Sequence, residues 1–135
     1  MITMKAVYTG DKHCEITHGP SGAKISTDAP KDNNGKGETF SPTDLVGAAL
    51  GTCVLTVMAI SAERDNIDLK GSYSEVTKEM QANPRRIARL PVNIHLPKSL
   101  TPEQRHKLEV IAKTCPVHRS LLHEIDSAIL FFYDI

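Results

Sequence analysis

A stretch of 18 residues without a charged side chain, Leu45 to Ala62, constrains the fold of this chain most. Its length reaches the lower limit for a helix that crosses a membrane. The stretch contains Gly47, Gly51 and several hydroxyl side chains, Asp44 and Glu63 lie directly beside it, and neither flank is basic. Membrane helices are typically flanked by basic residues on one side, so we expect a helix buried in a protein core.

The start of this helix is marked by capping residues. Ser41 suits the N-cap, Pro42 the first helical position, and Asp44 the third position of a capping box. A helix over about 42–65 would be apolar nearly all round, so a sheet, other helices or a partner chain should cover both of its sides. Gly47 and Gly51, one turn apart, predict close packing of another backbone against one stripe.

Strand-like segments and turn residues dominate the rest of the chain. Short segments at 2–8, 12–18 and 23–28, separated by Gly-containing turns, predict a β-meander. Segments 67–82 and 86–96 predict a hairpin around Asn83-Pro84. Alternation in the second segment predicts one apolar face, formed by Ala88, Leu90, Val92, Ile94 and Leu96.

Two short helices and a strand are predicted after the hairpin. Thr101 and Gln104 form a capping box for a helix ending near Thr114, and Pro116 begins another that carries Val117, Leu121 and Leu122. The apolar run 128–133 predicts a strand covered on both faces. The fold class is therefore α+β, with one domain over 1–135.

Charge and cysteine content narrow the function classes. Sixteen basic and sixteen acidic residues give no net charge, which argues against a nucleic-acid-binding protein. The basic residues Lys78, Arg85, Arg86 and Arg89 lack interleaved aromatic residues, so we interpret them as a solvated hairpin edge. Three cysteines and the lack of an apolar leader indicate a reducing compartment, the cytoplasm, and no membrane association is expected.

The cysteines differ in their predicted surroundings. Cys115 precedes Pro116 at a helix N-cap, and His118 and Arg119 lie within reach of it. The helix N-terminus and the basic side chains should both lower the pKa of the Cys115 thiol. Cys53 lies in the middle of the apolar helix, where the simplest interpretation is packing. Cys14 alternates with Lys12 on a predicted strand and is interpreted as a structural thiol.

Two segments together resemble the osmotically inducible (OsmC) and organic hydroperoxide resistance (Ohr) family. The first runs from Ser41-Pro42 through the Ala/Gly-rich helix to Cys53, and the second is Cys115-Pro116-Val117-His118, about 60 residues later. The resemblance covers most of the chain, including the element order. It implies an intertwined homodimer with active sites near the subunit interface, and cysteine-based peroxidase activity in the oxidative stress response.

The resemblance also implies roles for two residues. Cys53 matches the peroxidatic thiol, which takes an oxygen from an organic hydroperoxide or hydrogen peroxide, and Cys115 matches the resolving thiol. The resulting Cys53–Cys115 disulfide would be reduced by an external dithiol of the lipoyl type. No metal or other cofactor is implied.

The chain departs from the family at two activating groups. Family members place an arginine in the N-terminal strands, but this chain has no arginine before Arg64. The family's glutamate is also missing, because Thr43 occupies its position. Lys24 or Arg119 could replace the cation, and Glu38 or Asp44 the carboxylate, with His118 as a further supporting residue. Asp44 and Glu38 also have simpler interpretations, as a helix-capping charge and a solvated loop residue.

Two other function classes remain open. Zinc binding could draw on cysteine and histidine side chains, namely Cys14, Cys115, His13, His18, His118 and His123, although no Cys-x-x-Cys pair occurs. Alternatively, a dimer of the same fold could bind a small apolar or thiol ligand at its interface without peroxidase activity. The missing arginine and glutamate favour this second alternative.

Overall fold

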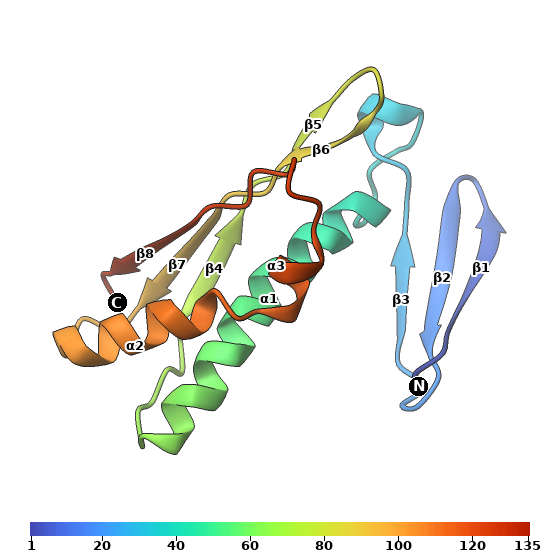
Figure 1. Ribbon diagram of the computed structural model, residues 1–135. Helices are drawn as coiled ribbons and strands as arrows, with labels where there is room; N and C mark the ends of the chain where they lie inside the picture. Colours follow the sequence, from blue (N-terminus) through green and yellow to red (C-terminus); the bar gives the residue numbers. More distant parts are fainter. The chain divides into compact units, whose positions relative to one another are not determined.

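The computed structural model describes residues 1–135 and contains two compact units, Met1–Val46 and Gly47–Ile135. The single domain expected from the sequence stays a prediction. The elements are β1 (Met4–Gly10), β2 (His13–His18), β3 (Lys24–Thr27), η1 (Lys31–Asn33), α1 (Pro42–Arg64), β4 (Tyr73–Val76), β5 (Glu79–Gln81), β6 (Arg86–Arg89), β7 (Val92–Leu96), α2 (Pro102–Ala112), α3 (Pro116–Ser120) and β8 (Ile129–Tyr133). This order confirms the α+β class (Figure 1).

The first unit is built on the predicted antiparallel meander, in the order β1-β2-β3. A turn with positive φ at Gly10, Asp11 and Lys12 joins β1 to β2. Gly10 suits the turn because glycine adopts positive φ at the lowest energetic cost. All but the last residue of β1 are exposed, so this strand has no apolar cover within its own unit. After β3 the chain continues through the short η1 helix towards α1.

The N-terminus of α1 carries the predicted capping box. The Ser41 N–H donates to Asp44 Oδ2 at 2.8 Å, and the Asp44 N–H donates to Ser41 Oγ at 3.1 Å. These two hydrogen bonds satisfy backbone donors that an α-helix leaves unpaired in its first turn. The helix therefore begins where the sequence predicts, at Pro42.

In the second unit, α1 packs closely on a sheet of order β4-β7-β8. A Cβ added at Gly51 would lie 2.7 Å from Ser74 Oγ and 2.8 Å from Val76 Cγ2. At Gly47 the nearest atom would be Leu90 Cδ2, at 3.4 Å. The glycine stripe thus lets the helix approach β4, as predicted from the spacing.

Only one stripe of α1 is buried within the chain. Gly47, Leu50, Gly51, Val54, Met58, Ser61 and Ala62 are buried, whereas Ala49, Thr52 and Thr56 are exposed and Ile60 keeps 48% of its surface. The chain itself therefore leaves one side of this apolar helix uncovered.

The predicted hairpin is divided into two pairs of strands. β4 pairs with β7 and β5 pairs with β6, because the ladder is interrupted at Thr77-Lys78 and at Leu90-Pro91. Leu90, Val92, Ile94 and Leu96 are fully buried, as expected. Ala88 is only half-buried while Ile87 is buried, so the predicted alternation fails before the interruption. Pro91 has no backbone N–H to donate to a neighbouring strand, which explains the interruption at Leu90-Pro91.

After β7, two helices lead to β8, which joins the same sheet. α2 has the predicted capping box of Thr101 and Gln104, α3 begins after the N-cap Cys115, and β8 pairs in parallel with β7. α3 ends at Ser120, so Leu121 caps it and Leu122 lies beyond it, exposed.

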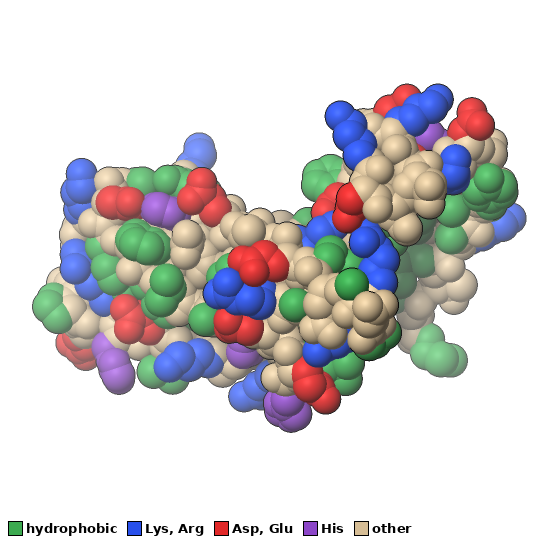
Figure 2. All heavy atoms as spheres, turned by 90° about the horizontal axis from the view of Figure 1, so that it is seen from above, with side chains coloured by type: hydrophobic (Ala, Val, Ile, Leu, Met, Phe, Trp, Pro, Cys, Tyr) green, Lys and Arg blue, Asp and Glu red, His purple; other side chains and the backbone are tan.

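The outer face of this sheet is open, so the prediction that β8 is covered on both faces is wrong for the chain alone. Leu130 and Phe132 keep 55% and 39% of their surface. Phe132 stacks on His95, which also stacks on Tyr73 at 4.4 Å between ring centroids. Acidic, basic and hydrophobic side chains are mixed over the face shown in Figure 2.

Candidate active site

Two thiols far apart in the sequence meet in the second unit. Cys53 lies in the middle of α1 and Cys115 is the N-cap of α3, and their side chains are close enough for Cys53 to influence the pKa of Cys115. Both are free thiols. Their proximity follows from the packing of α3 beside α1, which no local sequence pattern specifies. Such a pair can interconvert between dithiol and disulfide.

Burial controls the chemistry of Cys115. This residue is 0% exposed, and burial raises the pKa of its thiol, with the hydrogen bond to Cys53 as the next cause. The backbone N–H of His118 donates to Cys115 Sγ at 3.4 Å and lowers the pKa by a smaller amount. The predicted lowering of the Cys115 pKa is therefore wrong, because desolvation of the thiolate outweighs the helix N-terminus.

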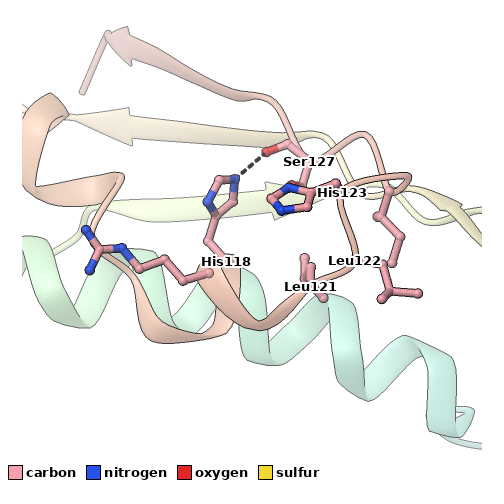
Figure 3. A pocket seen from close by; sticks show the side chains of 7 residues that line it. His118, Leu121, Leu122, His123 and Ser127 are labelled. Carbon is pink, nitrogen blue, oxygen red and sulfur yellow. Dashed lines mark hydrogen bonds between the residues drawn. The ribbon is translucent and has the colours of Figure 1, made fainter.

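The side chains of His118 and Arg119 do not act on Cys115 as the sequence suggests. His118 Nε2 lies 3.2 Å from the carbonyl oxygen of Ser127, as the dashed line in Figure 3 shows. No cation is among the causes that shift the Cys115 pKa. Instead His118, Arg119 and His123 line a pocket of about 320 Å³ together with Leu121, Leu122, Ile125 and Ser127.

Cys53 has the more accessible thiol of the two. It is half-buried, while Leu50 and Val54 on the adjoining stripe of α1 are fully buried. A reagent from solution therefore reaches Cys53 more readily than Cys115. The arrangement combines an accessible thiol with a buried thiol beside it.

The remaining predicted site residues have partners of their own. Lys24 Nζ forms an ion pair with Glu15 Oε1 at 2.8 Å, and Asp44 completes the capping box of α1. Glu38 Oε2 lies 3.1 Å from His13 Nε2. The capping interpretation of Asp44 is confirmed, whereas Glu38 belongs to a cluster rather than being simply solvated.

The cysteines and histidines considered for zinc do not form one cluster. Cys14 pairs with Tyr8 and Thr27 in the sheet of the first unit, and the His18 ring contacts Ser21 Oγ at 2.6 Å. One group of three ligand atoms does lie within 4.8 Å, from His13, Asp28 and Glu38. No motif spacing connects its members, so no local pattern in the sequence indicates this group.

The basic hairpin edge has the expected surface character. Arg89 forms ion pairs with Glu79 at 3.0 Å and with Asp126 at 2.9 Å, and all three side chains are about half exposed. These contacts account for Arg89 without a nucleic-acid ligand.

Comparison with known proteins decides the family. The profile of the OsmC-like protein family matches residues 35–129. The chain belongs to the OsmC-like family. This OsmC-like protein is similar to the crystal structure of a Psychrobacter arcticus 273-4 protein described provisionally as an osmotic stress induced and detoxification response protein, with 39% identity, a TM-score of 0.92, and 98% and 96% of the two chains covered.

More distant structures share the fold alone. An OsmC-like protein from Mycoplasma pneumoniae has 16% identity and a TM-score of 0.82, covering 98% of this chain and 96% of its own. OhrB of Bacillus subtilis, an organic hydroperoxide resistance protein, has 17% identity and a TM-score of 0.68, covering 98% of each chain. No protein of curated function matches significantly.

The central helix packs against the sheet although it is apolar along its length. α1 is long and apolar enough to cross a membrane, but core helices pass the same test. Here its glycine stripe lies against β4.

Proposed function

We propose that this OsmC-like protein is a thiol-dependent peroxidase, with Cys53 as the peroxidatic and Cys115 as the resolving cysteine. The observation that carries the proposal is the interaction between the thiols of Cys53, a half-buried residue, and Cys115, a fully buried one. An accessible sulfur can meet a peroxide, and a buried neighbouring sulfur can then capture the oxidised product. Relatives of the same fold include organic hydroperoxide resistance proteins.

The proposed first step oxidises Cys53. Its thiolate sulfur attacks the outer oxygen of an organic hydroperoxide or hydrogen peroxide, the O–O bond breaks, and a sulfenic acid forms on Cys53. The departing alkoxide takes up a proton and leaves as an alcohol, or as water when the substrate is hydrogen peroxide. The peroxide is thereby reduced by two electrons and the sulfur is oxidised by two.

The second step closes the disulfide. Cys115 sulfur attacks the sulfenic sulfur, the S–O bond breaks, and the hydroxyl group leaves as water with the proton of the Cys115 thiol. An external dithiol, of the lipoyl type in our proposal, then reduces the Cys53–Cys115 bond and is itself oxidised to a disulfide. This cycle uses cysteine chemistry throughout and requires no metal, haem or flavin.

We further propose that the working form is a cytoplasmic homodimer. β1 is exposed along nearly its whole length, and α1 leaves apolar positions such as Ile60 open. A second copy of the chain would cover such surfaces, because an uncovered strand and an apolar helix side favour association. Light scattering at micromolar concentration should give twice the mass of one chain, and a monomer mass would contradict the proposal.

A second candidate is a ligand-binding protein of the same fold without peroxidase activity. Its support is that the interactions shifting the Cys115 pKa include no cation and that burial raises this pKa. A buried thiol with a raised pKa, as at Cys115, holds less thiolate at neutral pH. This candidate predicts that Cys53→Ser leaves binding of a small apolar or thiol ligand at the subunit interface unchanged.

Peroxide consumption by cysteine variants separates the two candidates. Cumene hydroperoxide and hydrogen peroxide are supplied with dihydrolipoamide, and wild type is compared with Cys53→Ser, Cys115→Ser and the control Cys14→Ser. We expect turnover in wild type and Cys14→Ser, none in Cys53→Ser, and a sulfenic acid that accumulates in Cys115→Ser. Wild type that neither turns over nor forms the Cys53–Cys115 bond would exclude the peroxidase.

A further inference from the structure

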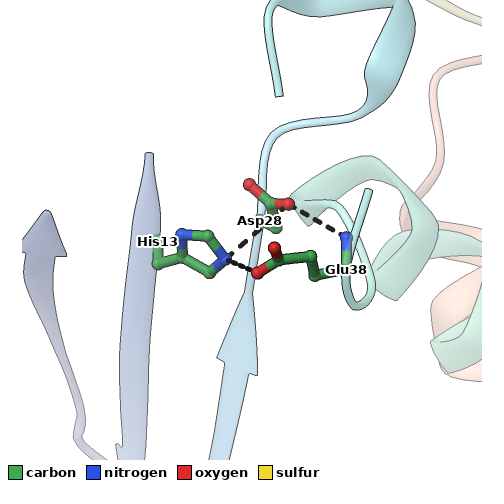
Figure 4. A group of neighbouring side chains, drawn as sticks. All are labelled: His13, Asp28 and Glu38. Carbon is green, nitrogen blue, oxygen red and sulfur yellow. Dashed lines mark hydrogen bonds and ion pairs between the residues drawn. The ribbon is translucent and has the colours of Figure 1, made fainter. Parts of the chain in front are cut away.

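Three potential metal ligands meet at one end of the meander in the first unit. His13 comes from the start of β2, Asp28 directly follows β3, and Glu38 lies in the segment before α1 (Figure 4). His13 Nε2 is 3.1 Å from Glu38 Oε2 and 3.7 Å from Asp28 Oδ2. We propose that these three side chains bind a divalent cation of the zinc type, a function separate from the chemistry of Cys53 and Cys115.

The spacing of the ligand atoms suits one zinc ion. Zinc binds imidazole nitrogen and carboxylate oxygen at roughly 2.0–2.2 Å in tetrahedral geometry, so ligand atoms around it lie roughly 3.3–3.5 Å from one another. The two separations from His13 Nε2, 3.1 and 3.7 Å, bracket that value. All three ligand atoms lie within 4.8 Å of one another.

The imidazole of His13 is oriented as in a metal ligand. Its Nδ1 lies 2.8 Å from the carbonyl oxygen of Asp11, which can only accept a hydrogen bond. With Nδ1 donating to that carbonyl oxygen, Nε2 is the ring nitrogen that faces the carboxylates and would coordinate a cation. Ligating histidines commonly donate their second N–H to a carbonyl in this way.

Asp28 supplies the second, independent observation. Its side chain is 0% exposed, and Oδ1 is a buried oxygen without a hydrogen-bond partner. Oδ2 accepts the backbone N–H of Glu38 at 3.0 Å and is the oxygen nearest His13. A buried carboxylate oxygen without a hydrogen-bond donor is costly, and the contact of Oδ2 with His13 leaves Oδ1 unsatisfied. A cation bound by both oxygens would satisfy it.

The donor set defines the class of metal. One imidazole and two carboxylates form a borderline-hard set that suits zinc better than the soft thiophilic metals. Cys14, although adjacent to His13 in the sequence, points to the opposite face of β2 because side chains alternate along a strand. Glu38 is 57% exposed at its side chain, which leaves an open side where water can complete the coordination.

Zinc binding by the full chain tests the proposal. Titration calorimetry with Zn²⁺ should show one strong site in wild type and in a Cys53→Ser variant, which shows that the thiol pair is not involved. Glu38→Gln and His13→Gln should each weaken binding by about tenfold or more, because they remove a ligand. The matched controls Glu15→Gln and His18→Gln, on the same strand, should bind as wild type does.

A cobalt(II) derivative supplies a spectroscopic readout. Cobalt bound by nitrogen and oxygen shows visible bands without the intense sulfur-to-metal charge transfer of thiolate ligation, and this spectrum is the expected result. Glu38→Gln is the preferred variant, since its exposed side chain allows folding, whereas Asp28→Asn also alters a buried hydrogen bond. Absence of zinc binding in wild type, equal affinity in Glu38→Gln, or a thiolate spectrum would each overturn the proposal and leave an ion-pair cluster.

Discussion

The side chains of Cys53 in the central helix and Cys115 at the N-cap of α3 interact, although only Cys53 has surface open to solvent. The pair therefore has a built-in order of reaction. A reagent from solution meets Cys53, and Cys115 reacts with what forms there. Two predictions concern this pair, and two concern packing elsewhere in the second unit.

The first prediction is that alkylation distinguishes the two thiols. Under native conditions iodoacetamide should modify Cys53 before Cys115, because Cys115 is 0% exposed and burial raises its pKa. Peptide mass spectrometry over a time course measures both rates, and denatured protein, in which the rates should converge, is the control. Faster modification of Cys115 in the native protein would contradict the proposed roles.

The second prediction concerns the pH dependence of disulfide closure. The reacting form of Cys115 is its thiolate, and burial followed by the hydrogen bond with Cys53 raises its pKa above the ordinary 9.0. Thiolate therefore continues to increase as pH rises through 9.0, and the closure rate should increase with it. Rapid quenching after one equivalent of peroxide, followed by mass spectrometry, measures this rate. A plateau well below pH 9.0 would argue against Cys115 as the resolving thiol.

The third prediction compares the two glycines of α1. Gly51→Ala should destabilise the fold by about 1–3 kcal/mol, because the new methyl group would overlap Ser74 Oγ and Val76 Cγ2. Gly47→Ala is the matched control, since its methyl group makes ordinary contacts and alanine favours the helix by about 1 kcal/mol. Urea unfolding measures both values. Equal stability of the two variants would mean that α1 does not approach β4 as closely as described.

The fourth prediction concerns Tyr133, whose hydroxyl donates to Glu109 Oε1 and whose ring lies 4.1 Å below the Arg105 guanidinium. Tyr133→Phe should lower the free energy of unfolding by about 1–2 kcal/mol at pH 7, because Glu109 loses its donor. Tyr73→Phe, which keeps the stacked ring on His95, is the control and should have a smaller effect.

The Tyr133 contribution also has a defined pH dependence. Burial, and then the hydrogen bond to Glu109, raise the pKa of Tyr133 above its ordinary value of 10.0. The folded state thus binds the proton more tightly than the unfolded state, so the contribution is complete below pH 10 and is lost as pH rises further. Unfolding at pH 7 and pH 11 should show a smaller difference between wild type and Tyr133→Phe at the higher pH.

Local patterns in the sequence were sufficient for much of the fold. The capping boxes at Ser41 and Thr101, the Cys-Pro start of α3 and the three short strands were all located correctly. These signals depend on hydrogen bonds within three or four residues, so no tertiary context is needed to recognise them. The glycine stripe likewise predicted a close approach, although not that Ser74 and Val76 make it.

The sequence alone therefore determined where the helices begin and which residues are apolar. It also placed Cys53 in the Ala/Gly-rich helix and Cys115 directly before Pro116. Tertiary structure decided the rest: that Cys53 and Cys115 touch, that burial outweighs the helix N-terminus at Cys115, and that His13, Asp28 and Glu38 converge. The physical reason is that desolvation and contacts between distant segments depend on what packs around a residue. Spacing along the chain carries no record of that packing.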